Sequence, residues 1–170
     1  MSAVSNTFDL VVIGGGPGGY AAALYGASAG LQVALVEKDA LGGTCLNRGC
    51  IPAKAFLETA AVKRHVEHSA DFGIESGAPT VNFATTQARK QKIVAGLVGG
   101  IAAMCKGRKV EVFNGTGALG SDRTVTVQLN DGGTETITGG HVILAAGSVP
   151  RLIPGFERGG PIMTSDEVLD

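Results

Sequence analysis

The chain has no tryptophan, few aromatic residues and almost no net charge. Aromatic residues make up 5% of its 170 positions, and the formal net charge is −1. Neither the aromatic stacking surface nor the basic patch of a nucleic-acid-binding protein is therefore expected. No apolar run approaches the ~18–20 residues that cross a bilayer. With 44% hydrophobic and 17% charged residues, the chain is expected to fold around a core of its own.

Cysteine is scarce and irregularly spaced. The three cysteines, Cys45, Cys50 and Cys105, are too few for the disulfide framework of a small secreted protein. The first ten residues lack the basic region and apolar core of a secretory signal. These absences predict a cytoplasmic protein, in which a close cysteine pair is more often catalytic or metal-binding than structural.

Glycine is the one residue in clear excess. The chain holds 27 glycines among 170 residues, more than twice the usual ~7%. They follow no Gly-X-Y period, which excludes a collagen-like helix. Tight turns and close backbone approaches are therefore the expected use of this glycine.

Alternating strands and helices predict an α/β protein. Apolar runs predict strands at 8–13, 32–36, 110–113 and 141–145, and alternation around the turn at 130–133 predicts a hairpin of 124–129 with 134–138. Helices are predicted at 21–29, at 54–70 and from an N-cap at Asn82 to about residue 106. On the last helix we expect one buried stripe of Ile93, Leu97, Ile101 and Met104. Together these elements predict a doubly wound parallel sheet with a small antiparallel β-meander inserted.

The spacing of Gly14, Gly16 and Gly19 is GxGxxG, between the first strand and the first helix. The first glycine permits a sharp turn, the second lets a pyrophosphate approach the backbone, and the third lets helix and strand pack closely. The helix N-terminus offers free N–H groups to phosphates. Glu37, at the end of the second strand, is placed to accept a hydrogen bond from a ribose hydroxyl. The pattern therefore predicts the dinucleotide-binding turn of a Rossmann-like fold.

Cys45 and Cys50 lie five positions apart where a helix is expected to start. Gly49 and Pro52 allow the distortion that brings both thiols to one face, and a helix N-terminus is expected to lower a thiol pKa. An oxidisable pair beside a nucleotide turn suits two-electron exchange with a bound redox cofactor. Two alternatives stay open at this point, a pair of buried structural thiols and half of a zinc site.

The segment GGTCLNRGCIPAK at 42–54 follows GGGPGGY at 14–20 and Glu37. This combination resembles the flavin-dependent pyridine nucleotide–disulfide oxidoreductases, and the resemblance extends over the whole chain, including HVILAAGS at 141–148. Leu46 and Ile51 favour the branch of that family that oxidises dihydrolipoyl groups. The resemblance implies FAD as the cofactor of this chain and NAD as a cofactor of the full-length enzyme, bound outside it.

The resemblance also implies residue roles. Cys45 would be the thiol that meets dihydrolipoamide, Cys50 the thiol against the flavin, and Lys54 would face the reactive part of the flavin ring. Ala146 stands where the family often has threonine. The cofactor-binding residues implied are Gly14, Gly16, Pro17, Gly18, Gly19, Glu37, Lys38, Gly43, Thr44, Cys45, Lys54, Gly117, Ala118, Ala146, Gly147 and Ser148, with the pair Gly117 and Ala118 lining the adenine.

Members of this family are more than twice as long as the chain. We therefore expect residues 1–170 to be the N-terminal FAD-binding domain, without the second glycine motif that binds NAD and without the dimerisation domain. His65, His68 and His141 lie in the wrong context for the family's catalytic base, and Cys105 is expected in the core. The implied partners are a lipoyl domain of a 2-oxoacid dehydrogenase complex and, in the full-length enzyme, a second copy of the chain.

Two alternatives remain beside this interpretation. One is a flavin disulfide reductase of the mercuric or glutathione type. The other is a flavin- or nucleotide-binding module without turnover. For the 170 residues alone we expect no dihydrolipoamide:NAD⁺ turnover, weak FAD binding, and self-association through an exposed sheet edge.

Overall fold

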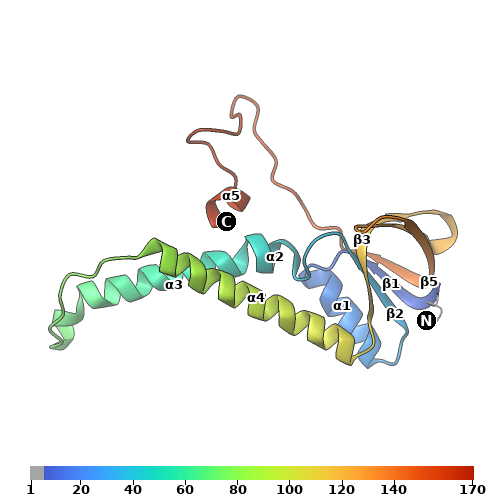
Figure 1. The fold of residues 1–170 in the computed structure, drawn as a ribbon, viewed down its shortest axis with the longest axis horizontal. Coiled ribbons are helices and arrows are strands. Elements are labelled where there is room, and N and C mark those ends of the chain that lie inside the picture. Colours follow the sequence, from blue (N-terminus) through green and yellow to red (C-terminus); the bar gives the residue numbers. More distant parts are fainter. Residues whose placement is uncertain (1–5) are drawn as a thin grey trace.

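The computed structural model describes residues 6–170 as one mixed sheet with helices on one side (Figure 1). The strands are β1 (Thr7–Ile13), β2 (Val33–Glu37), β3 (Glu111–Leu119), β4 (Thr124–Leu129) and β5 (Thr134–Leu144). The helices are α1 (Pro17–Ser28), α2 (Gly43–Arg48), α3 (Cys50–Glu67), α4 (Phe83–Gly107) and α5 (Ser165–Leu169), with short 3₁₀ turns at Ser69–Phe72 and Ser121–Arg123. Among the described residues, no helix is both long enough and apolar enough to cross a membrane.

The centre of the sheet is parallel. β1 pairs in parallel with β2 on one side and with β5 on the other, and β2 pairs in parallel with β3. Val11 stands opposite Ala34 on β2 and opposite Val142 on β5. Both Val11 and Val12 are fully buried although their side chains point to opposite faces. Their β-branched run therefore marks a strand covered on both sides, as the sequence predicted.

Two long strands turn this parallel sheet into a closed one. Residues 111–114 of β3 pair with β2, while residues 115–119 of the same strand pair with β4 in the antiparallel sense. β5 does the same, since residues 134–138 pair with β4 and residues 138–144 pair with β1. The order β1-β2-β3-β4-β5 closes on itself as a barrel. The exposed sheet edge expected from the sequence is therefore wrong for the described strands.

The α/β class and the meander are confirmed, but the described sheet is not a doubly wound parallel one. One core cluster joins the parallel strands to the helices and to the start of β3: Leu10, Val12, Ala23, Val33, Leu35, Leu46, Ile101, Cys105 and Val110. The other joins the opposite face to the meander: Phe8, Val11, Ile13, Ala34, Val36, Phe113, Val125, Val127 and Ile137. The meander thus covers the face that a doubly wound fold would cover with a second helix layer.

Several element boundaries differ from the sequence prediction. α1 begins at Pro17 rather than at residue 21, since proline suits the first helical position, and α3 begins at Cys50 rather than at residue 54. The strands expected at 134–138 and 141–145 are one strand, β5. Gly139 and Gly140 suggest a break in the strand. They instead allow β5 to approach β1 closely, because a Cβ on Gly140 would lie 2.9 Å from the carbonyl oxygen of Asp9.

The long helix α4 is confirmed, together with its cap. Asn82 Oδ1 accepts a hydrogen bond from the Thr85 N–H at 3.1 Å. The expected apolar stripe is wrong in part, because Ile101 is buried whereas Leu97 and Met104 are 44% and 43% exposed. The buried residues of α4 are Thr86, Lys90, Ile101 and Cys105. Only the C-terminal turns of α4 cover the sheet, while its earlier turns pair with α3 away from it (Figure 1).

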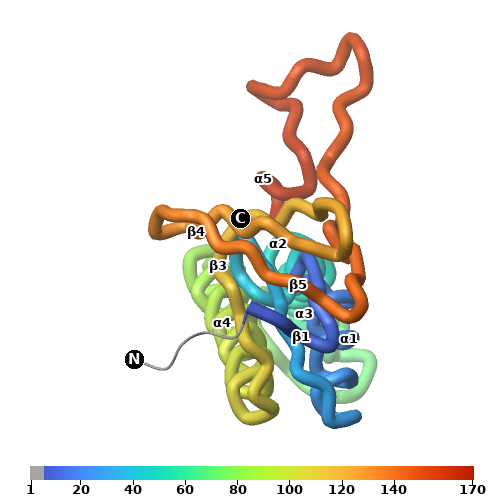
Figure 2. The backbone as a smooth tube through the Cα atoms, turned by 90° about the vertical axis from the view of Figure 1, so that its right-hand side faces the viewer, coloured from blue at the N-terminus to red at the C-terminus, as the bar shows by residue number. Residues whose placement is uncertain are grey.

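After β5 the chain leaves the sheet, makes a long excursion and returns to α2 with the short helix α5 (Figure 2). Lys90, buried on α4, holds this return. Its Nζ donates to the main-chain oxygens of Leu169 and Asp170 at 2.9 and 2.7 Å. The ammonium also lies 5.7 Å from the centre of the Phe56 ring. The last residues are thus tied to the helix layer beside α2.

Candidate functional site

The turn after β1 depends on Gly14. Its φ is +105°, and a Cβ there would lie 2.1 Å from the carbonyl oxygen of Ala145. The Gly14 N–H donates to the Val36 carbonyl at 2.8 Å, which closes the turn against β2. Both the conformation and the contact exclude a side chain. The sharp turn predicted for the first glycine is therefore observed.

The other glycines of the motif keep the start of α1 bare. A Cβ on Gly19 would lie 1.7 Å from the Gly14 carbonyl oxygen, so α1 packs directly on the turn. Gly16 is the N-cap, with Pro17 following it, and no side chain caps the helix there. Around Gly18 nothing lies within 4 Å of the Cβ position. The helix N-terminus is therefore open on this side, as an anion site requires.

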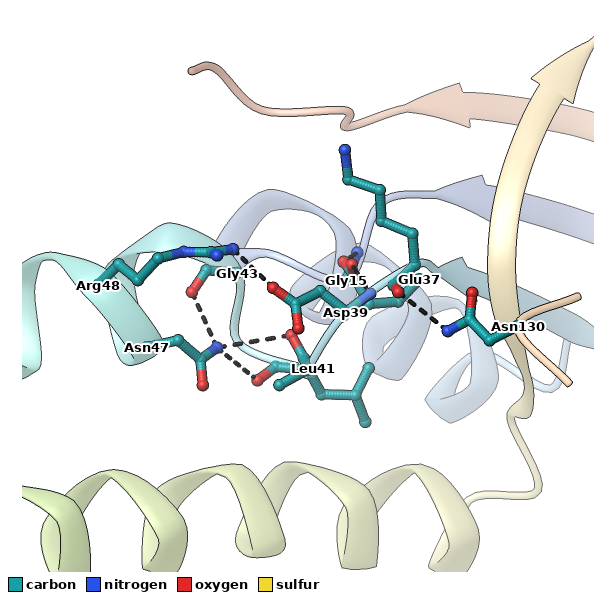
Figure 3. A network of polar contacts seen from close by, with 10 residues as sticks. Gly15, Glu37, Asp39, Leu41, Gly43, Asn47, Arg48 and Asn130 are labelled. Atoms are coloured by element: carbon teal, nitrogen blue, oxygen red, sulfur yellow. Dashed lines mark hydrogen bonds and ion pairs between the residues drawn. The ribbon is translucent and has the colours of Figure 1, made fainter. Parts of the chain in front are cut away.

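Glu37 lies at the carboxyl end of β2 and braces the turn. Its side chain is buried, with Oε2 accepting the Gly15 N–H at 2.6 Å and Oε1 accepting the Asp39 N–H at 2.8 Å. Glu37 is therefore part of the turn and not a surface acid. Lys38 is exposed, and its carbonyl accepts a hydrogen bond from Asn130 Nδ2 at 3.0 Å (Figure 3).

A second backbone segment lies against the glycine turn. The Gly42 N–H donates to the Gly15 carbonyl at 2.8 Å. Gly43, with φ +56°, approaches Gly16 so closely that a Cβ on Gly43 would lie 2.6 Å from the Gly16 Cα. Two glycines back to back leave a cradle of main chain, without side chains, between the starts of α1 and α2.

The two cysteines flank a break between helices. Cys45 lies in α2, Cys50 opens α3, and Gly49 between the helices has φ −143° and ψ −107°. A Cβ on Gly49 would lie 3.0 Å from the Thr44 carbonyl oxygen, so the break is tightly packed. The distortion expected from Gly49 is observed. Both cysteines are free thiols, Cys45 half-buried and Cys50 exposed.

The thiols interact with each other. A hydrogen bond with the Cys50 side chain raises the pKa of the Cys45 thiol above its ordinary value, and desolvation adds to the rise. The Cys50 backbone N–H and the charge of Lys54 lower the pKa of Cys45, but by less. The lowered pKa expected at a helix start is therefore wrong for Cys45, because a thiol neighbour outweighs the helix terminus.

The remaining predicted positions lie around the same end of the sheet. Thr44 on α2 and Lys54 on α3 are exposed. Ala146, Gly147 and Ser148 are exposed and follow β5 where it meets the glycine turn, since the Ala145 N–H donates to the Ile13 carbonyl at 2.8 Å. The structure brings these segments together at the carboxyl ends of β1, β2 and β5, where ligands bind in open α/β sheets.

Gly117 and Ala118 lie on β3. The Cβ position of Gly117 points into the core, 3.1 Å from the Val36 side chain and 3.2 Å from that of Ile13, while Ala118 is exposed. Val36 and Ile13 stand at the carboxyl ends of their strands. The pair is therefore near the glycine turn, and Ala118 is the member with an accessible side chain.

The spacing GxGxxG occurs a second time, at Gly115, Gly117 and Gly120. These glycines lie on β3 and directly after it, paired to β4 in the antiparallel sense. A 3₁₀ turn and another strand follow them, not a helix. This second occurrence therefore lacks the helix N-terminus that a pyrophosphate site needs, and an NAD-binding motif is not found in the described residues.

Cys105 lies in the core, as the sequence predicts. Cys105 is 1% exposed and lies in the core between helices and sheet, where burial raises its pKa. His65, His68 and His141 are exposed. Within residues 6–170 no three or more His, Cys, Asp and Glu side chains are grouped closely enough to hold a metal ion.

Sequence reasoning missed the polar contacts that hold α2 in place (Figure 3). Arg48 pairs with Asp39 at 2.7 Å, and Asn47 Nδ2 donates to carbonyls of the loop before α2. Asn47 stands four residues after Gly43, one helical turn on, which is the only signal the sequence offered. Arg48 and Asp39 carry no such signal, because their spacing fits no single element.

The glycine turn after β1 packs against the segment that leads into Cys45, so a dinucleotide-type turn and two free thiols lie in neighbouring segments. The family model of the pyridine nucleotide-disulphide oxidoreductases matches residues 8–169, and the chain belongs to this family. The match identifies it as the family's FAD-binding portion and implies FAD as its cofactor.

Among curated relatives, dihydrolipoyl dehydrogenases are similar to nearly the whole chain. The enzyme of Chlamydia pneumoniae is 41% identical over 167 residues, which are 98% of this chain and 36% of the relative. The enzyme of Bacillus subtilis is 39% identical over 175 residues, 98% of this chain and 37% of the relative. That of Mycobacterium tuberculosis strain H37Rv is 41% identical over 161 residues, 94% of this chain and 34% of the relative. The chain therefore spans about a third of the length of these relatives.

The residues at the glycine turn fit an FAD. A pyrophosphate needs backbone N–H groups without side chains in the way, and the start of α1 with Gly16 and Gly18 offers them. A ribose needs an acceptor at the end of β2, and each oxygen of Glu37 holds one N–H and retains a further lone pair. Bound FAD would supply a two-electron acceptor, and Cys45 and Cys50 are free thiols near the start of α3.

Proposed function

We propose that residues 1–170 form the FAD-binding domain of a dihydrolipoyl dehydrogenase. The full-length enzyme would oxidise dihydrolipoamide through Cys45 and Cys50, with NAD⁺ as the final acceptor. The observation that carries the proposal is the contact of Gly43 with Gly16, which sets α2, the helix that carries Cys45, directly against the dinucleotide turn.

We assign the parallel strands and α1 to a Rossmann-type nucleotide site. The N–H groups at the start of α1 hold the pyrophosphate, and Glu37 accepts the ribose hydroxyls while repelling a 2′-phosphate. Gly117 and Ala118 line the adenine. Lys38, Thr44 and residues 146–148 complete the binding surface from the neighbouring loops.

The cysteine pair carries the thiol chemistry. With Cys45 and Cys50 joined in a disulfide, one thiolate of dihydrolipoamide attacks Cys45 Sγ, and Cys50 leaves as a thiolate. The second thiolate of the substrate then attacks the substrate sulfur that is bonded to Cys45, and Cys45 leaves as a thiolate. Lipoamide leaves oxidised, two protons are released, and the pair holds two electrons. The positive charge of Lys54 favours the thiolate of Cys45.

The proposal includes the partners and the location that the sequence predicts. A lipoyl domain of a 2-oxoacid dehydrogenase complex is the substrate carrier, and the full-length enzyme is a homodimer in the cytoplasm. The relatives' name supports the dihydrolipoyl substrate.

The test uses the purified chain reconstituted with FAD under anaerobic conditions. Dihydrolipoamide should bleach the visible flavin spectrum, and Cys45→Ser and Cys50→Ser should each abolish the bleaching. Cys105→Ser is the matched control and should leave it unchanged. Peptide mapping of the oxidised protein without reduction should show Cys45 linked to Cys50 and Cys105 free.

The competing functions give other results in the same assay. Bleaching by reduced glutathione in preference to dihydrolipoamide would assign a glutathione-type reductase. Bound FAD that no thiol reduces would assign a flavin-binding module without turnover. A chain that binds no FAD would overturn the proposal altogether.

A further inference from the structure

Asn47 ties helix α2 to the loop that precedes it. Its Nδ2 donates to the Gly43 carbonyl at 2.9 Å, to that of Leu41 at 3.1 Å and to that of Ala40 at 3.5 Å (Figure 3). The first of these lies within the helix, whereas the other two cross back to the loop. One side-chain amide therefore gathers three main-chain oxygens of residues 40–43.

The same loop is bonded on its other side to the nucleotide turn. The Gly42 N–H donates to the Gly15 carbonyl at 2.8 Å, and the Gly15 N–H donates to Glu37 Oε2 at 2.6 Å. A continuous series of hydrogen bonds thus runs from the amide of Asn47 to the carboxylate of Glu37. Cys45 lies on α2, between Gly43 and Asn47.

Residues 38–42, between β2 and α2, form no helix or strand. Gly42 and Gly43 have φ of +96° and +56°, so the loop is built from residues that lose most conformational freedom on folding. α2 has six residues and no side-chain cap, and a helix so short is not stable by itself. The position of α2 therefore depends on contacts such as those of Asn47.

We propose that Asn47 is a positioning residue that holds α2, and with it Cys45, in register with the nucleotide turn. It acts through residues 40–43 and not on a reacting atom. Loss of its amide donor should loosen α2, and so lower both the effective concentration of Cys45 toward Cys50 and the affinity for FAD. The second effect rests on the proposed function, whereas the first does not.

The experiment compares the purified chain with Asn47→Leu, Asn47→Asp and Asn47→Ser. Leucine and aspartate have nearly the size of asparagine but lack the donor, and the serine hydroxyl reaches Gly43 but not Leu41. Gln128→Leu and Gln128→Glu are the matched controls, because Gln128 Nε2 also donates to a carbonyl, that of Gly133 at 3.0 Å, in the β4–β5 hairpin.

Each protein is equilibrated with reduced and oxidised glutathione, and free thiols are counted by alkylation and mass spectrometry. Oxidised glutathione takes two electrons and two protons from Cys45 and Cys50, which gives one protein disulfide and two reduced glutathiones. The equilibrium constant is the effective concentration of the pair. It should fall by at least about five-fold in Asn47→Leu and Asn47→Asp, because five-fold is the effect of one lost hydrogen bond and the amide makes three. It should stay within two-fold in the Gln128 variants. FAD affinity, followed by flavin fluorescence, should fall in parallel.

Unchanged equilibrium constants in the Asn47 variants would overturn the proposal, as would an equal fall in the Gln128 variants. If Asn47→Leu loses its far-ultraviolet circular dichroism, Asn47→Ser decides, because it keeps the bond within the helix. Failure of the unsubstituted chain to bind FAD would overturn the proposed function and leave the glutathione equilibrium to decide on Asn47.

Discussion

Glu37 holds two main-chain N–H groups with one buried carboxylate, one in the nucleotide turn at Gly15 and one in the loop after β2 at Asp39. Hydrogen bonds to a charged acceptor contribute more than neutral ones, about 1.5–3 kcal/mol each. The sequence motif predicts this acid for a ribose. The structure adds a structural role, because Oε2 braces the turn at Gly15 and Oε1 braces the following loop at Asp39.

Glu37→Ala is expected to weaken FAD binding by about 1–3 kcal/mol, because a charged acceptor of the ribose hydroxyls is lost. It should also lower the free energy of unfolding of the FAD-free chain, because two N–H groups lose their partner. Calorimetric titration with FAD and urea denaturation measure the two effects. Glu37→Gln serves as the comparison, since it keeps one acceptor oxygen and should lose less of both. An FAD affinity unaltered by Glu37→Ala would refute the ribose role.

Cys45 owes its raised pKa first to the Cys50 side chain, so its thiolate forms only at a pH above that of an ordinary cysteine. We expect alkylation of Cys45 by iodoacetamide at neutral pH to be slower than in the denatured chain. Cys50→Ala should speed it, because the largest cause of the raised pKa is removed. Lys54→Met should slow it further, because the Lys54 charge favours the thiolate. Rates from mass spectrometry across pH 6–10 decide, and a change of opposite sign in either variant would contradict the structure.

At the scale of elements, Gly18 and Gly19 are neighbours in the first turn of α1 but have different structural roles. A Cβ on Gly19 meets a main-chain oxygen at 1.7 Å, whereas a Cβ on Gly18 meets nothing within 4 Å. Gly19 therefore sets the contact between helix and turn. Gly18 leaves the helix terminus open, and a non-proline residue substituted there would keep the same backbone N–H.

Gly19→Ala should therefore lower the free energy of unfolding by about 3 kcal/mol or more, since an extra methyl group forces the helix off the turn. Gly18→Ala should be neutral or stabilising by up to ~1 kcal/mol, because alanine favours helix over glycine. Urea denaturation of both variants measures the difference. Equal effects would mean that α1 does not pack on the turn as described.

β3 and β5 are the elements that pattern analysis resolved least well. The sequence predicts four residues of β3, but the strand runs for nine, and two predicted strands are the single strand β5. Each strand pairs with one neighbour along its first part and with another neighbour along the rest. Both strands contain glycines, at 115 and 117 in β3 and at 139 and 140 in β5, and glycine is depleted in strands, so the residue pattern understates the length of both.

At the scale of the whole molecule, closure of the sheet changes one expectation. The described strands pair in a closed order, so self-association through a free strand edge is no longer expected. The expectation that the chain alone has no dihydrolipoamide:NAD⁺ turnover does not depend on the sheet edge. It depends on the histidines and on the second glycine motif. His65 lies fifteen residues along α3 from Cys50, which is about 22 Å along a helix.

We accordingly expect the 170-residue chain to produce no NADH from dihydrolipoamide and NAD⁺, even with excess FAD. No described histidine is placed to take the thiol proton, a role worth about 10²–10⁴-fold, and the second GxGxxG lies on a strand without a helix after it. Steady-state absorbance at 340 nm tests this beside a full-length dihydrolipoyl dehydrogenase. Turnover within a few-fold of that control would refute the expectation.

The sequence by itself determined the nucleotide turn, the cysteine pair and the alternation of strands and helices. Each is a local pattern, in which glycine spacing, apolar runs or a cap such as Asn82 act within one or two elements. Cys105 and the hairpin turn at 130–133 belong to the same group.

Only the tertiary structure decided how the segments that carry these patterns contact one another. The closed sheet, the approach of Gly43 to Gly16, the bracing by Glu37 and the raised pKa of Cys45 all depend on atoms from segments that meet after folding. Distances of 2–4 Å between separate segments are set by packing, and residue spacing along the chain does not encode them.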